Sequence, residues 1–283
     1  MATIWLNCDL ENLQSILPDK IQNSDITGVM LPFSKDVDID AIKFGCDLLM
    51  DKYDDGEDGF VCLKLDPHLA NDTKKLISMA KELSSSVDED NFMVGIPATT
   101  EGIEAIKVLA TCDINICATH IFSPNQASQS AQAMREMSRS TEGVISVSVS
   151  PFDEMLNASL AVNNLSKDRI GFFNAIKIYN QIVQMGLSNV KVLFDELTIH
   201  QPWLDENYYI EQLNLHNAIL NLPRNLIEAI DIEDLTPSFE FQTKHIDAFF
   251  SYLTLANISL QSTYETLLTQ SIQKDIELLE KKS

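Results

Sequence analysis

Positive charge is scarce in this chain. Lysine and arginine number 20 against 42 aspartates and glutamates, so the formal net charge is -22. Arginine occurs only at Arg135, Arg139, Arg169 and Arg224. Such a surface repels nucleic acid and anionic lipid, so we expect neither as a partner. An anionic substrate would need donors placed locally at its site.

Long apolar runs are also missing. No stretch approaches the ~18 apolar residues of a membrane-spanning helix. Residues 1–6 show no basic region followed by an apolar core, as a secretion signal would. We therefore expect a cytoplasmic protein without membrane contact. The five cysteines are odd in number and fit no zinc or redox spacing, which predicts reduced thiols.

Metal-ligand patterns are absent as well. No two of the five histidines stand at the spacing of a metal site, so we expect neither a metal nor a cofactor. By strand alternation, His120 falls on the outward face of its predicted strand.

A regular alternation of short apolar runs and longer helical patterns fills the chain. With 45% hydrophobic residues, a large core is possible. Strands are predicted at residues 3–8, 26–31, 60–65, 92–96, 114–122, 144–149, 190–194 and 217–222. Eight strands, each followed by a helix, predict one α/β domain over residues 1–283, a (β/α)8 TIM barrel.

The sequence ends in a predicted C-terminal helical extension. Its apolar residues recur at helical spacing, at Leu260, Tyr264, Leu267, Leu268, Ile272, Ile276 and Leu279. We expect this helix to pack on the barrel. A dimer face is the alternative, so the chain is expected to be a monomer or a homodimer.

Three predicted strands end in a polar residue followed by proline. These pairs are Asp66-Pro67, Ser123-Pro124 and Ser150-Pro151. An N-cap oxygen with proline at the first helical position is how a helix begins, and Gln126 completes a capping box with Ser123. The junctions mark the face of a barrel on which chemistry occurs.

The third to sixth predicted strands resemble the transaldolase family in order and spacing. The resemblance is carried by residues 63–70, by residues 91–99 with Glu101 and Gly102, by residues 119–123 and by residues 144–150. Weaker similarity reaches residues 5–7 and the C-terminal helix. The resemblance implies a TIM barrel fold and a family role in the pentose phosphate pathway. It also implies carbon transfer through a Schiff base.

The same resemblance implies catalytic residues that this sequence lacks. The Schiff-base lysine falls on Gly95, the proton-relay glutamate on Lys64, the acid/base aspartate on Asn7, and the phosphate-binding arginine on Pro151. Glycine supplies no primary amine for a Schiff base. We therefore predict a transaldolase-like pseudoenzyme that lacks ordinary transaldolase activity.

Some polar positions remain for binding a ligand. Thr119 and Ser146 match the family and, together with Glu196, are predicted to bind substrate. Asp195 and Glu196 follow the seventh strand, where the family has small residues. A solvated loop acid is the ordinary interpretation of Glu196, but a carboxylate in the mouth would disfavour a sugar phosphate. The expected ligand is a small carbonyl compound or a sugar.

Lys64 offers an alternative function. Alternation turns Lys64 into the barrel beside Gly95, whose missing side chain leaves room. A desolvated lysine there would have a lowered pKa and could form a Schiff base, which would make the protein an active aldolase. The opposing interpretation is a buried ion pair with Asp66, Asp195 or Glu196. An unpaired amine in an open mouth favours the enzyme, and a paired ammonium favours the binding protein.

Overall fold

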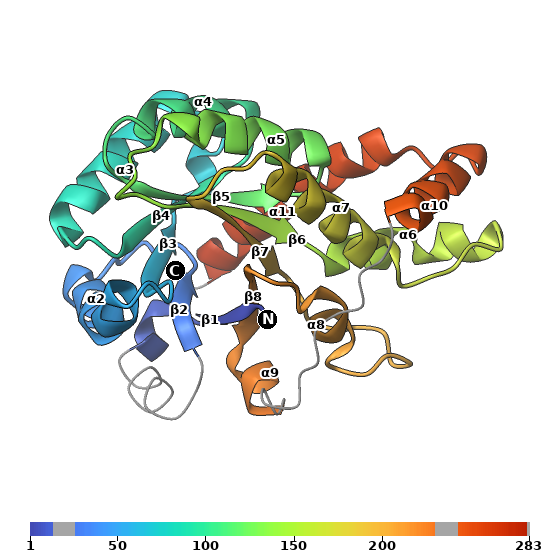
Figure 1. The fold of residues 1–283 in the computed structure, drawn as a ribbon, viewed down its shortest axis with the longest axis horizontal. Coiled ribbons are helices and arrows are strands. Elements are labelled where there is room, and N and C mark those ends of the chain that lie inside the picture. The colour runs from blue at the N-terminus through green and yellow to red at the C-terminus, as the bar shows by residue number, and fades with distance from the viewer. Residues whose placement is uncertain (14–25, 230–242, 282–283) are drawn as a thin grey trace.

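Parallel strands form a closed barrel in the computed structural model, which describes residues 1–13, 26–229 and 243–281 (Figure 1). The strands are β1 Thr3–Asn7, β2 Ile26–Leu31, β3 Phe60–Lys64, β4 Phe92–Pro97, β5 Asn115–Ile121, β6 Gly143–Ser148, β7 Val190–Asp195 and β8 Ala218–Pro223. Each pairs in parallel with the next, and β8 closes on β1. The predicted (β/α)8 barrel is confirmed, and every predicted strand boundary lies within about one residue of the observed one.

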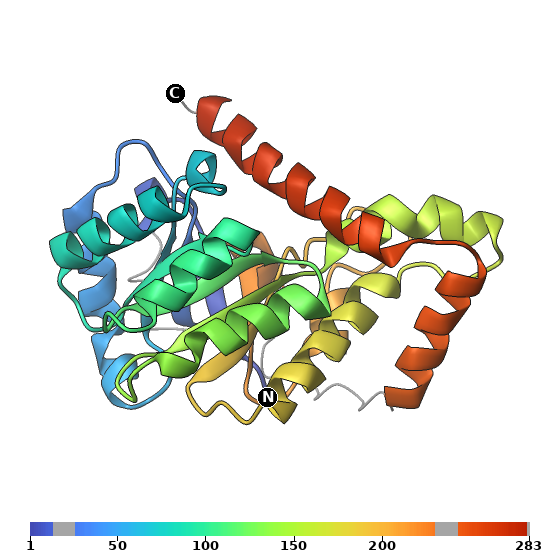
Figure 2. The same cartoon turned by 90° about the horizontal axis from the view of Figure 1, so that it is seen from above.

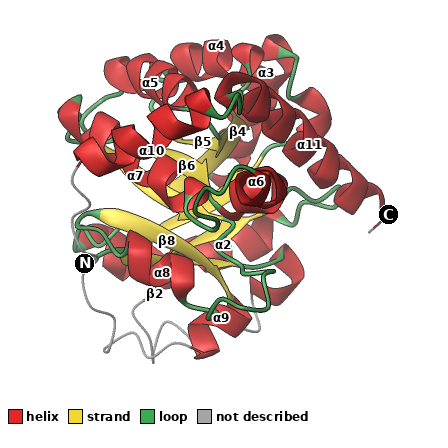
Figure 3. Ribbon diagram, turned by 90° about the vertical axis from the view of Figure 1, so that its right-hand side faces the viewer, coloured by secondary structure: helices red, strands yellow, loops and turns green. Residues whose placement is uncertain are grey.

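Helices surround the strands (Figure 3). They are α2 Ile39–Asp54, α3 Thr73–Val87, α4 Thr100–Leu109, α5 Pro124–Ala133, α6 Ser150–Val162, α7 Ile170–Gln184, α8 Tyr208–Leu213, α9 Arg224–Ala229, α10 Thr243–Leu255 and α11 Leu260–Lys281. Short 3-10 helices lie at Pro67–Leu69 and Met134–Glu136. Over the described ranges, no helix is both long enough and apolar enough to cross a membrane.

Two apolar layers follow from the alternation of side chains along the strands. The outward residues, such as Val61 and Leu63, pack against the helices in the larger cluster. The inward residues fill the barrel with the side chains of Trp5, Met30, Phe60, Cys62, Met93, Cys117, Val144, Leu193 and Ile219. The middle of the barrel is therefore a packed apolar core, and polar inward residues lie at its two ends.

A buried ion pair closes the opposite end of the barrel. Lys191 Nζ lies 2.6 Å from Asp58 Oδ1, and Asp58 Oδ2 accepts hydrogen bonds from Thr3, Thr27 and Trp5. Because each donor lies near the start of a strand, these contacts bind the amino ends of the strands together.

The predicted helix starts are confirmed at two of the three junctions. Ser123 caps α5 in a capping box with Gln126, and Asp66 Oδ1 accepts from the backbone N of His68. At the third junction the prediction is wrong by one residue, because α6 begins at Ser150 itself and follows Val149, which makes no side-chain cap.

The C-terminal helix α11 runs across the carboxyl end of the barrel (Figure 2). It contacts the 3-10 helix Pro67–Leu69, strand β5 and helix α6. Its Tyr264 ring packs edge-on against Phe152 at 5.8 Å between centroids, and Tyr264 donates to Asn174 Oδ1 at 3.2 Å. The predicted packing of this helix on the barrel is confirmed, and it covers the mouth.

Candidate functional site

A cavity of about 300 Å³ lies at the carboxyl ends of the strands, with α11 forming one wall. The strands contribute the inward side chains Asn7, Lys64, Ser148, Asp195 and Asn221. Helix α11 contributes Ser271, Lys274, Asp275 and Leu278. This is the face on which barrel enzymes carry their chemistry.

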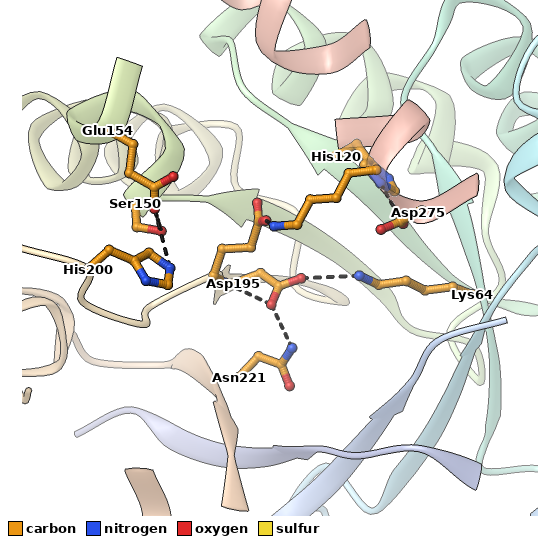
Figure 4. Close-up of polar contacts among 10 residues, drawn as sticks. Lys64, His120, Ser150, Glu154, Asp195, His200, Asn221 and Asp275 are labelled. Carbon is orange, nitrogen blue, oxygen red and sulfur yellow. Dashed lines mark hydrogen bonds and ion pairs between the residues drawn. The ribbon is translucent and has the colours of Figure 1, made fainter. Parts of the chain in front are cut away.

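Lys64 and Asp195 form the central contact of this cavity (Figure 4). Lys64 Nζ lies 3.4 Å from Asp195 Oδ2. Asp195 Oδ1 accepts from Asn221 Nδ2 at 2.8 Å and from the backbone N of Glu196 at 2.8 Å. The Asp195 side chain is 7% exposed, so these three donors hold a buried carboxylate in place.

The charge environment keeps Lys64 protonated. Burial acts to lower the pKa of Lys64, but the negative charges of Asp195, Asp275 and Glu196 together outweigh burial and raise the pKa above its ordinary value. The lowered pKa that a nucleophilic Lys64 would need is therefore absent from the resting site. Of the two interpretations of Lys64, the structure contains the ion pair, and its partner is Asp195.

Gly95 lies directly across from Lys64 on the neighbouring strand β4. A Cβ built on Gly95 would lie 3.0 Å from Lys64 Cα and 3.2 Å from Lys64 Cγ, which is tighter than nearly all real Cβ contacts. The stem of Lys64 therefore occupies the space beside the glycine, and a larger residue at position 95 would crowd it.

Asp195 and Glu196 are not solvated loop acids. Asp195 is the last residue of β7, and Glu196 is half-buried with Oε1 3.7 Å from Lys274 Nζ. Burial and the charge of Asp195 raise the pKa of Glu196, against the opposing charges of Lys274 and Lys64. The ordinary interpretation of Glu196 was wrong because α11 lies over the end of this strand.

His120 belongs to the site, so its predicted outward orientation is wrong. His120 has φ +57°, and the β5–β6 register shifts between Ala118 and Ile121. Alternation holds only along a regular strand, and it fails at this irregularity. Nδ1 lies 3.0 Å from Thr119 Oγ1, and Nε2 lies 3.0 Å from Asp275 Oδ2. The buried imidazole thus connects β5 to α11.

The far wall of the cavity is built from α6 and the segment after β7. Glu154 Oε1 lies 3.5 Å from Ser150 Oγ and 3.5 Å from His200 Nε2, away from Lys64 (Figure 4). Pro151 also lines this wall. None of the arginines of the chain is among the described residues that line the cavity.

The structure brings together only part of the predicted site. Asn7, Lys64 and Glu196 line the cavity, whereas Gly95 and Thr119 line a neighbouring hollow that shares Lys64.

Ser146 lies one inward position below Ser148, which lines the cavity. It is 1% exposed, and its hydroxyl has no hydrogen-bond partner in the part of the chain that the structure describes.

Sequence reasoning missed His120, Asn221 and the residues of α11. A signal for the helix was present, because Ser271, Lys274, Asp275 and Leu278 recur at the i, i+3, i+4, i+7 spacing of one helix face. No comparable signal existed for Asn221, which reads as one polar residue in an apolar strand.

Across residues 1–13, 26–229 and 243–281, no group of three or more His, Cys, Asp or Glu side chains could hold a metal ion.

Comparison with known sequences identifies a family for this chain. A family model described as Transaldolase/Fructose-6-phosphate aldolase matches residues 15–281. A transaldolase of Helicobacter pylori (strain Shi470) is 33% identical over 229 residues, which cover 79% of this chain and 71% of that protein. A transaldolase of Campylobacter jejuni subsp. jejuni serotype O:6 is 30% identical over 225 residues, covering 73% and 68%.

Proposed function

Because this chain belongs to the transaldolase/fructose-6-phosphate aldolase family, we propose that it binds a small, non-phosphorylated carbonyl compound or sugar in the barrel mouth and does not catalyse transaldolase chemistry. The observation that carries this proposal is the contact between Lys64 and Asp195. A nucleophilic amine needs a free lone pair, and a protonated, paired Lys64 offers none.

The family resemblance supports the loss of carbon transfer. It assigns the Schiff-base lysine to position 95, where a glycine stands and where the Lys64 stem occupies the neighbouring space. It assigns the acid/base aspartate to position 7 and the relay glutamate to position 64, which hold Asn7 and Lys64. Without an amine, a base and a relay, no imine forms and no proton moves from the substrate.

The lining of the cavity supports a ligand without phosphate. The resemblance assigns phosphate binding to position 151, and Pro151 has neither a positive charge nor a backbone N–H to donate. Glu154, Asp195, Glu196 and Asp275 all line the same cavity. A phosphorylated sugar would bring further negative charge beside these carboxylates, so a neutral or positively charged ligand fits better.

One observation favours a second candidate, an aldolase that uses Lys64. The Lys64 side chain is 21% exposed and lines the cavity, so a carbonyl ligand could reach its Nζ. For this reaction the ligand would have to displace Asp195 and free the lone pair, which the raised pKa of Lys64 opposes.

Borohydride trapping separates these two functions. Purified protein is incubated with fructose 6-phosphate or glycolaldehyde, reduced with borohydride, and analysed by peptide mass spectrometry. We expect no added mass on Lys64 and no transfer of carbon from fructose 6-phosphate to erythrose 4-phosphate. The matched control is Lys64→Arg, which keeps the charge but forms no imine. An adduct present in the natural protein and absent from K64R would establish the aldolase and overturn our proposal.

A further inference from the structure

The first half of α11 is anchored to the barrel by apolar contacts. The side chain of Leu267 is buried within the larger apolar cluster, and three further side chains of this half pack against that cluster, those of Leu260, Tyr264 and Leu268. Removal of this apolar surface from water holds the first half in place.

The second half of α11, from Ser271 to its end, is held mainly by polar contacts. Among the described residues, Ile272, Ile276 and Leu278 join neither apolar cluster, and Leu278 is 47% exposed although it lines the mouth. Leu279 is buried close to the end of the helix. The polar contacts join Lys274 Nζ to Glu196 Oε1 at 3.7 Å, Asp275 Oδ2 to His120 Nε2 at 3.0 Å, and Glu280 Oε1 to His68 Nε2 at 3.7 Å.

The contact between Asp275 and His120 is the strongest of these three (Figure 4). It is the shortest, and the His120 side chain is 8% exposed, whereas the other two contacts join more exposed groups that water screens. Burial acts to raise the pKa of Asp275, but the hydrogen bond from His120 and the charge of Lys64 lower it on balance. An ionised carboxylate can only accept, so the Nε2 atom of His120 carries the proton.

Two threonines lie where the apolar attachment of the helix ends. Thr266 Oγ1 donates to the backbone O of Ser262 at 2.7 Å. Thr269 Oγ1 likewise donates to the backbone O of Glu265 at 2.9 Å. A hydroxyl that bonds to the carbonyl four residues earlier competes with the backbone N–H for that carbonyl and tends to bend a helix. The helix is therefore weakened between its two halves.

The second half of α11 divides the barrel mouth. Asp275 and Leu278 line both the cavity and the neighbouring hollow, so this part of the helix stands between them. Lys64 and His120 also line both spaces from the barrel side. Lifting the second half would join the two spaces above the pair of Lys64 and Asp195.

We propose that the second half of α11, residues 271–281, is a lid that lifts from the barrel mouth, with the contact between Asp275 and His120 as its latch. The lid goes beyond the proposed function, because it concerns entry to the mouth and not the identity of the ligand. Opening breaks the latch and exposes Leu279, so the closed form predominates. The first half stays on the core, and the helix bends near Thr266 and Thr269.

Amide hydrogen exchange followed by mass spectrometry measures the opening. Asp275→Ala removes the latch, although alanine is the better helix former and would by itself slow exchange. In D275A we expect the amides of residues 272–281 to exchange at least about tenfold faster than in the natural protein. The amides of residues 260–268 and of the barrel strands should be unchanged, which also verifies that D275A is folded.

Carboxyl labelling tests whether this opening exposes the mouth. The probe is a water-soluble carbodiimide with glycine ethyl ester, and the site measured is Asp195, whose side chain is 7% exposed. In D275A we expect the labelling rate of Asp195 to rise at least about fivefold, because the reagent enters when the lid lifts. Lys274→Ala breaks the neighbouring contact with Glu196 and should raise both signals by a smaller factor, so the test does not depend on one variant.

Glu277→Ala is the matched control. Glu277 is exposed, lies on the same half of the helix, and bonds to Gln273 of α11, so its loss changes the net charge equally and leaves the latch intact. We expect E277A to keep both rates within about twofold of the natural protein.

The contrary outcomes are separable. Unchanged exchange and labelling in folded D275A and K274A, or equal rises in E277A, overturn the latch. Faster exchange without faster labelling of Asp195 means that the helix end frays without opening the mouth, and overturns the lid. Equally faster exchange in residues 260–268 also overturns it, because the whole helix would then detach. No ligand is used, so these outcomes leave the proposed function to the borohydride test.

Discussion

At position 64, a lysine side chain extends from β3 into the mouth of the barrel and meets Asp195 of β7. Burial and negative charge act on the pKa of Lys64 in opposite directions, and the surrounding carboxylates prevail. The same residue on the same strand could have been a nucleophile in an apolar pocket. Its partner, more than its burial, therefore determines its chemistry.

The Lys64–Asp195 pair should contribute measurably to stability. Lys64→Met leaves the Asp195 carboxylate buried without its cation, so we expect the free energy of unfolding to fall by about 2–3 kcal/mol. Urea denaturation at pH 7 measures this change. Adding Asp195→Asn to K64M should recover part of the loss, because it removes the uncompensated charge.

An exposed pair supplies the comparison. Lys75 and Asp72 lie 3.3 Å apart, with side chains 69% and 40% exposed. Lys75→Met should lower the free energy of unfolding clearly less than K64M does, since water screens such pairs. Equal losses in K64M and K75M would show that the pair in the mouth is no stronger than a surface pair.

At the scale of elements, α6 supplies the cap that α7 lacks. Asp153 of α6 accepts from the backbone N of Ile170 at 3.0 Å and of Gly171 at 3.3 Å, the first residues of α7, and from the Tyr209 hydroxyl at 2.8 Å. No side chain adjacent to α7 in the chain makes this cap. Burial raises the pKa of Asp153 to about 7, although these three hydrogen bonds oppose the rise.

This raised pKa predicts a dependence of stability on pH. The folded state keeps the proton on Asp153 up to about pH 7, while the unfolded state releases it near pH 4. Ionisation of the Asp153 carboxyl therefore destabilises the folded state progressively as the pH rises from about 4 to about 7. Asp153→Asn has no proton to lose. Between pH 5.5 and pH 8 the natural protein therefore loses stability that D153N keeps. We expect the unfolding free energy of D153N minus that of the natural protein to rise by about 2 kcal/mol over this interval.

Urea denaturation at the two pH values measures this difference. Asp205→Asn serves as the control, because Asp205 is exposed and its substitution should shift stability equally at both. If D153N and the natural protein changed in parallel with pH, the buried carboxyl would not be the titrating group.

For the whole molecule, the charge imbalance is the dominant electrostatic feature. With 42 acidic and 20 basic side chains, the folded chain repels itself at neutral pH. Salt screens this repulsion over the about 10 Å that applies near 0.1 M. We therefore expect the melting temperature to rise by a few degrees between about 0.01 M and 0.3 M NaCl, as measured by calorimetry.

Comparison of salts separates screening from the binding of one ion. Potassium chloride at equal ionic strength should give the same rise as sodium chloride, because screening depends on ionic strength alone. A constant or falling melting temperature would mean that stabilising ion pairs, such as Asp58 with Lys191, outweigh the net repulsion.

Much of the fold was predictable because its signals are local. Alternation along β3 correctly turned Lys64 inward and Leu63 outward, and the capping box at Ser123 correctly marked the start of α5. The same rule failed at His120, where a positive φ and a register shift interrupt the strand. Local rules describe regular elements and cannot locate their irregularities.

By itself, the sequence determined the order of strands and helices and the side of each regular strand that faces the core, because both follow from the pattern of neighbouring residues. It also showed directly that position 95 holds a glycine. Only the tertiary structure decided that Lys64 pairs with Asp195, 131 residues away, and that Asp275 of α11 meets His120, 155 residues away. These contacts exist because the barrel closes and the last helix crosses its mouth. Their chemistry could not be obtained from the periodicity of any single segment.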